Sequence, residues 1–356
     1  MQGSENKDTI FVLNTGSTST KLGLFSEGTE VASIVHRHTA DELEKFGKIW
    51  EQLDFRTGIA RSWLNSRGVR PSAVVGIGGL LRSVAGGTYT VNERMVADAR
   101  ANLQGEHASN LGCAIAKNIA AENSCPAFVV DPVSVDEFES LARLSGHPLI
   151  ERRSLSHALN IHSVARLTAG KLGKLLEETR LIVAHLGGGI SIAPVVGGKI
   201  VDANDASSDG PFSPERTGGL PLQQFIGLCY SGKYSEGEVR KLVMGKGGLS
   251  AYLGTISAHA VEDRIFHGDD AAREIFEGMA YQIAKEIGAM ATVLKGQVDA
   301  IALTGGLAGS KILVEWIRER VEFISPVQVF PGEDEMKALA LGALRVLRGE
   351  EGIMEY

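Results

Sequence analysis

The sequence Asn14-Thr15-Gly16-Ser17-Thr18-Ser19-Thr20-Lys21 joins two short runs of strand-forming residues, 9–13 and 22–25. This arrangement predicts a β-hairpin whose turn is the quoted stretch. The turn offers backbone N–H groups, several hydroxyl groups and one ammonium group, and these groups bind phosphate well. An ordinary polar hairpin has a similar composition, so this stretch alone leaves both interpretations open.

A second three-stranded pattern lies near the middle of the chain. Its strands are predicted at 181–184, 190–195 and 199–202. The glycine run Gly187-Gly188-Gly189 follows the first of these strands, and the first hairpin also continues into a third predicted strand, 31–36. Asn14 and His185 therefore occupy equivalent places. The repeat predicts a duplicated α/β fold with a phosphate-binding turn in each half and a nucleotide cleft between the halves.

The composition fits two domains and excludes some classes of partner. A chain of 356 residues with 44% hydrophobic residues is long enough for two cores. The net charge is −7, from 36 basic and 43 acidic residues that are scattered along the chain. We therefore expect no electrostatic surface for nucleic acid or for an anionic membrane.

The sequence predicts a cytoplasmic protein. The first eight residues are polar, no signal peptide follows them, and no run of 18 apolar residues is present. The three cysteines, Cys113, Cys125 and Cys229, are widely spaced, which indicates neither a disulfide framework nor a zinc site.

The first half continues with a helix predicted at 43–66 and a strand predicted at 73–77 that leads into Gly78-Gly79. A dinucleotide-binding motif is rejected, because the third glycine and the long helix are missing. We expect these glycines to let the backbone approach a small ligand. Asp131 ends another predicted strand, 127–130, where a functional carboxylate and a simple turn former are both plausible.

The second half contains a long polar loop, 204–221, whose length favours either function or disorder. Arg216 lies in this loop and could extend a forked guanidinium group towards the cleft. The clearest predicted helix is 270–294, and a strand at 298–303 delivers Thr304-Gly305-Gly306. A final helix begins near the acidic run 333–335, which suits either the helix dipole or a magnesium ion.

Six segments in one order resemble the butyrate kinase family. They are the first turn, Gly105-Glu106-His107-Ala108-Ser109-Asn110, His185-Leu186-Gly187-Gly188-Gly189-Ile190-Ser191, residues 210–221, Thr304-Gly305-Gly306-Leu307-Ala308 and Pro331-Gly332-Glu333-Asp334-Glu335-Met336. Together they cover nearly the whole chain and form a specific signal. The resemblance extends to the acetate kinases and to the sugar kinase, heat-shock and actin-like superfamily, and it implies an actin-like (ribonuclease H-like) fold with two domains and an interdomain nucleotide cleft.

The resemblance also implies the domain limits. Residues 1–178 with 335–356 would form an N-terminal actin-like domain that holds the first phosphate turn and the acyl substrate. Residues 179–334 would form a C-terminal actin-like domain that binds the nucleotide. A homodimer or larger homo-oligomer is expected on the same ground.

The family's reaction implies roles for named residues. ATP would phosphorylate a short-chain carboxylate reversibly, with Mg²⁺ as cofactor, to give an acyl phosphate and ADP. The residues near the chemistry would be Asn14, Asp131, His185 and Arg216. The residues that bind ATP and its phosphates would be Gly16, Ser17, Ser19, Lys21, Gly187, Gly188, Gly189, Thr304, Gly305 and Gly306. Glu335 would be the acid associated with the metal, with Glu333 and Asp334 as competitors.

The sequence departs from the family at Ile77, where the family usually has an arginine that faces the substrate. Arg82, five residues later, is our candidate for the missing charge, beside Gly78 and Gly79 in the acyl site. Butyrate or a branched acid of four to five carbons is the expected substrate. Acetate or propionate, or a catalytically weak nucleotide-binding homologue, stays open as an alternative, because one methylene changes binding by only about 1–3 kcal/mol.

Overall fold

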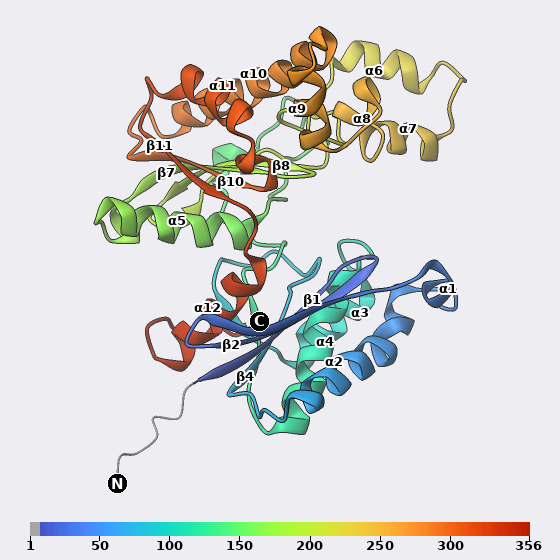
Figure 1. Ribbon diagram of the computed structural model, residues 1–356, viewed down its shortest axis with the longest axis vertical. Coiled ribbons are helices and arrows are strands. Elements are labelled where there is room, and N and C mark those ends of the chain that lie inside the picture. The colour runs from blue at the N-terminus through green and yellow to red at the C-terminus, as the bar shows by residue number, and fades with distance from the viewer. Residues whose placement is uncertain (1–7) are drawn as a thin grey trace. The chain divides into compact units, whose positions relative to one another are not determined.

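The computed structural model describes residues 8–356 (Figure 1). The chain forms two compact units: residues up to Asp136 together with Asp334–Tyr356, and Glu137–Glu333. The segment 137–178, which the sequence analysis gave to the first half, belongs to the second unit. Helix α5 (Ala158–Leu172) lies in this segment and packs against strands of the second unit's sheet.

The first unit contains a sheet of six strands in the order β3-β2-β1-β4-β6-β5. The strands are β1 (Thr9–Thr15), β2 (Ser19–Ser26), β3 (Thr29–Arg37), β4 (Ala73–Gly76), β5 (Thr88–Thr90) and β6 (Ala127–Val130). The first three form an antiparallel meander, and β1, β4 and β6 run parallel to one another. The predicted hairpin is therefore confirmed.

Helices cover both faces of this sheet. The helices of the first unit are α1 (Ala40–Leu43), α2 (Leu53–Arg67), α3 (Glu93–Ala101), α4 (Leu111–Asn123) and α12 (Glu335–Leu347). Both α4 and α12 pack against β1, β4 and β6. Residues 10–13 of β1 are fully buried although they alternate between the two faces, so neither face of this strand meets solvent.

The second unit repeats the same strand order. Its strands are β7 (Arg180–Leu186), β8 (Ile190–Val196), β9 (Lys199–Ile200), β10 (Ala300–Gly305) and β11 (Val327–Pro331). Read from β9, the order β9-β8-β7-β10-β11 matches β3-β2-β1-β4-β6 of the first unit. The duplication that the sequence predicted is therefore confirmed by topology.

The other helices of the second unit are α6 (Leu222–Cys229), α7 (Glu236–Val243), α8 (Gly248–Leu253), α9 (Ala258–Phe266), α10 (Asp270–Val293) and α11 (Lys311–Val321). The predicted helix 270–294 is α10, whose stripe of buried residues includes Phe276, Ile283 and Ile287. This stripe packs in the hydrophobic core of the unit with residues of β7, β8 and β10. Within residues 8–356, no helix is both long and apolar enough to cross a membrane.

One predicted helix begins later than expected. Residues 43–52 were predicted as the start of a helix, but α2 begins at Leu53 after a short 3₁₀ turn, Ile49–Gln52. The Glu51 carboxylate accepts hydrogen bonds from the backbone N–H groups of Gly47 and Lys48. These bonds cap the 3₁₀ turn and stop the helical pattern from extending towards the N-terminus.

The register of the parallel strands brings polar segments to one edge of each sheet. In the first unit, Leu13 pairs with Gly76 and Gly76 pairs with Val129, so the ends of β1, β4 and β6 lie side by side. In the second unit, Thr304 pairs with His185. Ligands bind at the carboxyl ends of the strands in such sheets.

Gly112 of α4 and Gly58 of α2 provide a test of the packing beneath this edge. A Cβ atom on Gly112 would lie 2.2 Å from the carbonyl oxygen of Ile77, whereas a Cβ atom on Gly58 would meet nothing within 4 Å. We expect Gly112→Ala to lower the free energy of unfolding by about 1–3 kcal/mol. Gly58→Ala should raise it by about 0.4–1 kcal/mol, because alanine favours a helix. Urea denaturation measures both, and equal effects would contradict the packing described for Gly112.

Candidate active site

The first hairpin turn presents a row of polar side chains. Asn14 lies opposite Lys21 in the register of β1 and β2, and Ser19 precedes Lys21 by two residues. Residues in these relations share one face of a sheet, so the three side chains project on the same side. The Nδ2 group of Asn14 donates a hydrogen bond of 2.7 Å to Oε2 of Glu335. The structure therefore brings the predicted phosphate turn together with the predicted acidic residue.

Arg56 of α2 holds this turn from the interior. Its side chain is fully buried. Its guanidinium group donates to the carbonyl oxygens of Gly16 at 2.9 Å, Ser19 at 3.0 Å and Ser17 at 3.3 Å. It also donates to the Gln52 side chain, at 3.0 and 2.8 Å. The turn is therefore fixed by a cation that contacts three of its carbonyl groups.

The charge of Arg56 is unusual in its surroundings. The described hydrogen-bond partners of Arg56 are carbonyl, amide and hydroxyl oxygens, and none of them is a carboxylate. Burial lowers the pKa of this guanidinium group from its usual range. A buried cation without an anionic partner favours an anion nearby, and a phosphate group on the turn would be such an anion.

The segment that follows β4, at the same edge of the sheet, is tightly packed around Gly78 and Gly79. A Cβ atom on Gly78 would lie 2.3 Å from Cβ of Pro132, and one on Gly79 would lie 2.4 Å from Oδ1 of Asn110. The same Oδ1 accepts a hydrogen bond from the backbone N–H of Leu80 at 2.8 Å. Contacts within the protein itself therefore require glycine at both positions. The sequence analysis had attributed these two glycines to the approach of a ligand.

Asp131 follows β6 in a left-handed conformation, with φ at 39°. Its side chain is buried, and Oδ1 accepts a hydrogen bond of 2.7 Å from the backbone N–H of Gly87. The backbone N–H of Asp131 donates in turn to the carbonyl oxygen of Gly87. The residue therefore links the end of β6 to the turn before β5 at the same edge of the sheet.

Arg82 is engaged by another residue. Its guanidinium group forms a bidentate pair with Asp98, with Nε 2.5 Å from Oδ2 and Nη2 3.0 Å from Oδ1. The hydroxyl group of Tyr356 donates to the same Asp98 carboxylate at 3.1 Å. The charge that was expected to hold a substrate carboxylate is already neutralised in this geometry.

In the second unit, His185 is the centre of a polar cluster at the end of β7. Its side chain is buried, and Nδ1 donates to Oδ1 of Asn160 at 2.9 Å. Nε2 lies 3.2 Å from a carboxylate oxygen of Glu333. The ring of His157 stacks on that of His185, with centroids 3.8 Å apart. The asparagine therefore fixes the orientation of the His185 ring.

The sequence analysis did not identify His157 and Asn160, which lie more than 20 residues before His185. Nδ1 of His157 forms a hydrogen bond of 2.9 Å with the hydroxyl group of Ser191. Burial is the largest cause that holds the pKa of His157 well below its usual range, and the nearby His185 and Arg216 lower it further. His157 is therefore neutral at pH 7. Its place at the start of α5, in a histidine-rich segment, is the signal that could have identified it.

Arg216 packs directly on the glycine turn that follows His185. A Cβ atom on Gly189 would lie 2.2 Å from Nη1 of Arg216, so any larger residue there would displace the guanidinium group. Nη1 donates to the carbonyl oxygen of Ala206 at 2.8 Å. The hydroxyl group of Ser213 donates to the carbonyl oxygen of Gly188 at 2.5 Å. The loop 204–221 is therefore held to the turn, and it places Arg216 beside Gly189.

Thr304 and Gly305 end β10 next to His185. Gly305 has φ at 89°, and a Cβ atom there would lie 2.4 Å from the carbonyl oxygen of Leu186. Gly305 and Gly332 exchange backbone hydrogen bonds of 3.2 and 3.0 Å. Gly306, in contrast, is exposed, and a Cβ atom there would meet nothing within 4 Å. Gly306 is the member of this predicted turn whose surface is open to a ligand.

The three consecutive acidic residues at the start of α12 have different partners. Glu333 contacts His185. Asp334 caps α12 by accepting a hydrogen bond from the backbone N–H of Lys337. Glu335 binds Asn14, and both of these side chains carry oxygen atoms of the kind that Mg²⁺ prefers. The donor set at Glu335 therefore fits a magnesium ion, whereas Asp334 acts as a helix cap.

Two sheets of the same topology, each with a polar turn at the carboxyl edge, define a duplicated α/β fold. The acetokinase family model matches residues 147–325. The chain is 49% identical to the probable butyrate kinase 2 of Caldanaerobacter subterraneus over 96% of this chain and 98% of that one. It is 46% identical to butyrate kinase 1 of Clostridium acetobutylicum, over 98% and 99% of the two chains.

Structural similarity agrees with this result. The crystal structure of Porphyromonas gingivalis acetate kinase covers 96% of this chain and 100% of its own, with a TM-score of 0.79 and 18% identity. This likeness supports the duplicated fold. The chain belongs to the acetokinase family.

Arg56 provides a test of how the first turn is held. We expect Arg56→Met to lower the free energy of unfolding by about 2–5 kcal/mol, because several buried carbonyl groups lose their donor. Arg61 lies on the same helix but pairs with Glu122 at the surface, so Arg61→Met should change stability little. Urea denaturation of both variants checks this prediction, and similar stabilities would contradict it.

Proposed function

We propose that this protein transfers the γ-phosphoryl group of ATP to the carboxylate of a short-chain fatty acid of four to five carbons. The observation that carries the proposal is the identity of 46–49% with butyrate kinases over nearly the full length of both chains. Both phosphate turns and Arg216 are present in the structure in arrangements that suit phosphate binding.

The reaction requires little covalent help from the protein. A carboxylate oxygen attacks the γ-phosphorus of ATP, the bond from that phosphorus to the bridging oxygen breaks, and ADP leaves with the electron pair. The carboxylate has already lost its proton at pH 7, so no general base is needed. The protein must place the reactants in line and disperse the negative charge.

The first hairpin turn would hold phosphate oxygens through Ser17, Ser19, Lys21 and the backbone N–H groups near Gly16. The charge of Arg56 beneath the turn strengthens this field. Bound Mg²⁺ would supply positive charge that offsets the charge of the phosphates, and Asn14 and Glu335 would hold it. Asp131 would support this edge of the sheet through its bonds with Gly87.

In the second unit, Arg216 and His185 are the groups that we assign to the transferred phosphoryl group. Both lie against Gly187–Gly189, whose lack of side chains lets them approach the backbone. Arg216 would stabilise charge in the transition state. Asn160 orients His185, and Thr304 with Gly305 and Gly306 would lie near the nucleotide.

The acyl site is where this chain departs from its relatives. Because Arg82 is paired with Asp98, we assign it a structural role and no longer expect it to bind the substrate. Ile77 is half-buried at the end of β4, where the family usually has an arginine. This substitution supports the alternative of a weakly active homologue, or of a different acid such as acetate or propionate.

A homo-oligomer is also part of the proposal. Exposed apolar side chains on and next to α6 support it: Leu222 is 73% exposed, Ile226 49% and Tyr230 88%. Such a surface is typical of a contact between protein chains.

The test is acyl phosphate formation by the purified protein with ATP and Mg²⁺, trapped with hydroxylamine across acetate, propionate, butyrate, isobutyrate and valerate. We expect product to peak at four or five carbons. Arg216→Ala should lower turnover by about 10²–10³. Arg240, an exposed residue paired with Glu236, provides the control, and Arg240→Ala should keep turnover. No product from any acid, with ATP still bound, would overturn the proposal.

Ile77→Arg tests the acyl site directly. We expect the new charge to lower the KM for the carboxylate by about 10- to 100-fold, as a charge-assisted hydrogen bond would, without changing the KM for ATP. Leu80→Arg, three residues later and also half-buried, is the matched control. Equal effects of the two substitutions would show that residue 77 does not face the carboxylate.

A further inference from the structure

A cluster of metal-binding side chains lies at the end of the first meander, apart from the residues assigned to phosphoryl transfer. It consists of His36 near the end of β3, His38 just after β3, and Glu42 in α1. One ligand atom from each residue lies within 4.8 Å of the others. Two imidazole groups and one carboxylate form a set of ligands that is common around zinc.

His38 carries a second observation that points to a ligand. It is only 7% exposed, and its Nδ1 atom is buried with no hydrogen-bond partner. The other ring nitrogen, Nε2, lies 2.9 Å from the hydroxyl group of Thr20. A buried polar atom is normally satisfied, so the Nδ1 atom of His38 requires an explanation.

We propose that His36, His38 and Glu42 bind a divalent transition metal ion of the Zn²⁺ type, with Nδ1 of His38 as the buried ligand. Imidazole nitrogen selects Zn²⁺, Co²⁺, Ni²⁺ or Cu²⁺ over Mg²⁺, which takes oxygen ligands. The site is therefore distinct in chemistry from the magnesium site at Glu335.

The surroundings of the cluster are arranged as metal sites require. Because Nε2 of His38 is hydrogen-bonded to Thr20, Nδ1 is the ring nitrogen that remains for a metal ion. Burial lowers the pKa of His38 to about 4, so the ring is neutral at pH 7. The Glu42 carboxylate accepts hydrogen bonds from the backbone N–H and the hydroxyl group of Thr39, which orient it. The hydrogen bond from the Thr39 backbone is the largest cause that lowers the pKa of Glu42, and the bond from the Thr39 hydroxyl group adds to it.

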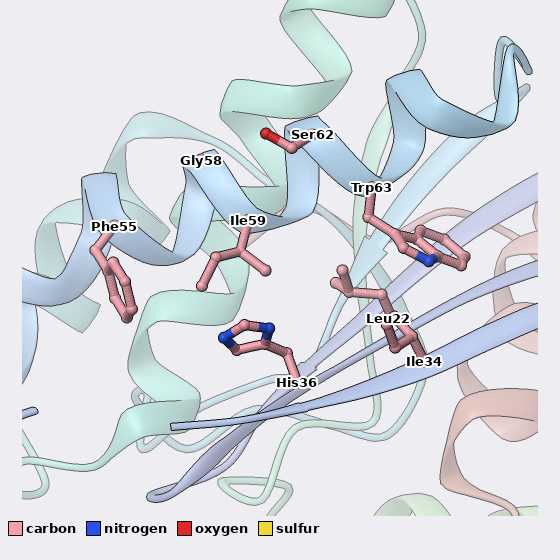
Figure 2. A pocket seen from close by; sticks show the side chains of 8 residues that line it. All are labelled: Leu22, Ile34, His36, Phe55, Gly58, Ile59, Ser62 and Trp63. Atoms are coloured by element: carbon pink, nitrogen blue, oxygen red, sulfur yellow. The ribbon is translucent and has the colours of Figure 1, made fainter. Parts of the chain in front are cut away.

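Binding of a metal ion would require small movements of the three side chains. Ligand atoms around tetrahedral zinc lie about 3.3 Å apart, so the side chains must approach by roughly an ångström or more. His36 and Glu42 are both partly exposed. Figure 2 shows His36 among the side chains that line a groove between the meander and α2. The groove holds about 580 Å³ and is lined mainly by apolar side chains such as Phe55 and Ile59.

The positive charge of Arg56 lies close enough to His38 to lower the pKa of its ring, so it also disfavours a metal cation there. The Thr20 hydroxyl group lies between them, because it accepts a hydrogen bond of 3.2 Å from Arg56. The same chain of bonds links His38 to the carbonyl groups of the phosphate turn. We therefore expect a moderate affinity, weaker than that of a structural zinc site.

The experiment is a titration of the full-length protein, freed of metal by a chelator, with Co²⁺ followed by visible absorption and with Zn²⁺ followed by calorimetry. It requires no substrate, so its result is independent of the proposed kinase activity. His36→Ala and Glu42→Gln remove surface ligands and should leave the fold intact by circular dichroism. His259→Ala is the control, because this exposed histidine has only Glu262 as an acidic neighbour.

We expect the wild-type protein to bind one equivalent that His36→Ala and Glu42→Gln each weaken by at least about tenfold. His259→Ala should bind as the wild type does. The proposal is overturned if no metal binds at neutral pH, or if the two ligand variants bind the metal as tightly as the wild type.

Discussion

The contact between the buried Arg56 guanidinium group and the carbonyl oxygens of the first hairpin turn is the interaction on which the candidate site depends. A turn that binds phosphate must direct donors outward, and its carbonyl groups then need donors inside the protein. Arg56 supplies them to Gly16, Ser17 and Ser19. Ser17 and Lys21 are accordingly exposed on the opposite side. One cation thus sets the shape of the turn and its electrostatic field.

The second unit supports its turn with different residues. Its turn consists of three glycines, of which Gly188 is exposed. The Ser213 hydroxyl group holds Gly188, and the Arg216 side chain covers Gly189. Here the cation lies beside the turn and comes from a long loop, whereas Arg56 comes from a helix. The duplicated sheet is therefore symmetric in topology, and the phosphate turns differ in how they are supported.

The sequence predicted the features that repeat or alternate along the chain. The two meanders, the equivalence of Asn14 with His185, and helix α10 all follow from local patterns, and the strand order and register confirm them. Contacts between distant residues were not predictable. Arg56 lies about 40 residues from the turn in sequence, and nothing in α2 distinguishes it from a surface arginine.

Contacts between distant residues also explain where the structure changed the interpretation of single residues. Arg82 was chosen for its distance from Ile77 in sequence, but Asp98 and Tyr356 neutralise it from elsewhere in the chain. In the acidic run 333–335 the sequence favoured Glu335 without excluding Glu333 and Asp334, and only the fold separates a helix cap from a partner of Asn14. Glycines after a strand indicated a ligand, whereas Gly78 and Gly79 are explained by close packing on Pro132 and Asn110.

The central claim is that the first turn of each meander binds phosphate. Amide hydrogen exchange, measured with and without ATP and Mg²⁺, tests it most directly. The account predicts slower exchange at residues 15–20 and 186–190 when the nucleotide is present. The second turn of each meander, at Glu27–Gly28 and Gly197–Gly198, should exchange at an unchanged rate. Protection of those control turns alone, or of neither first turn, would contradict the account.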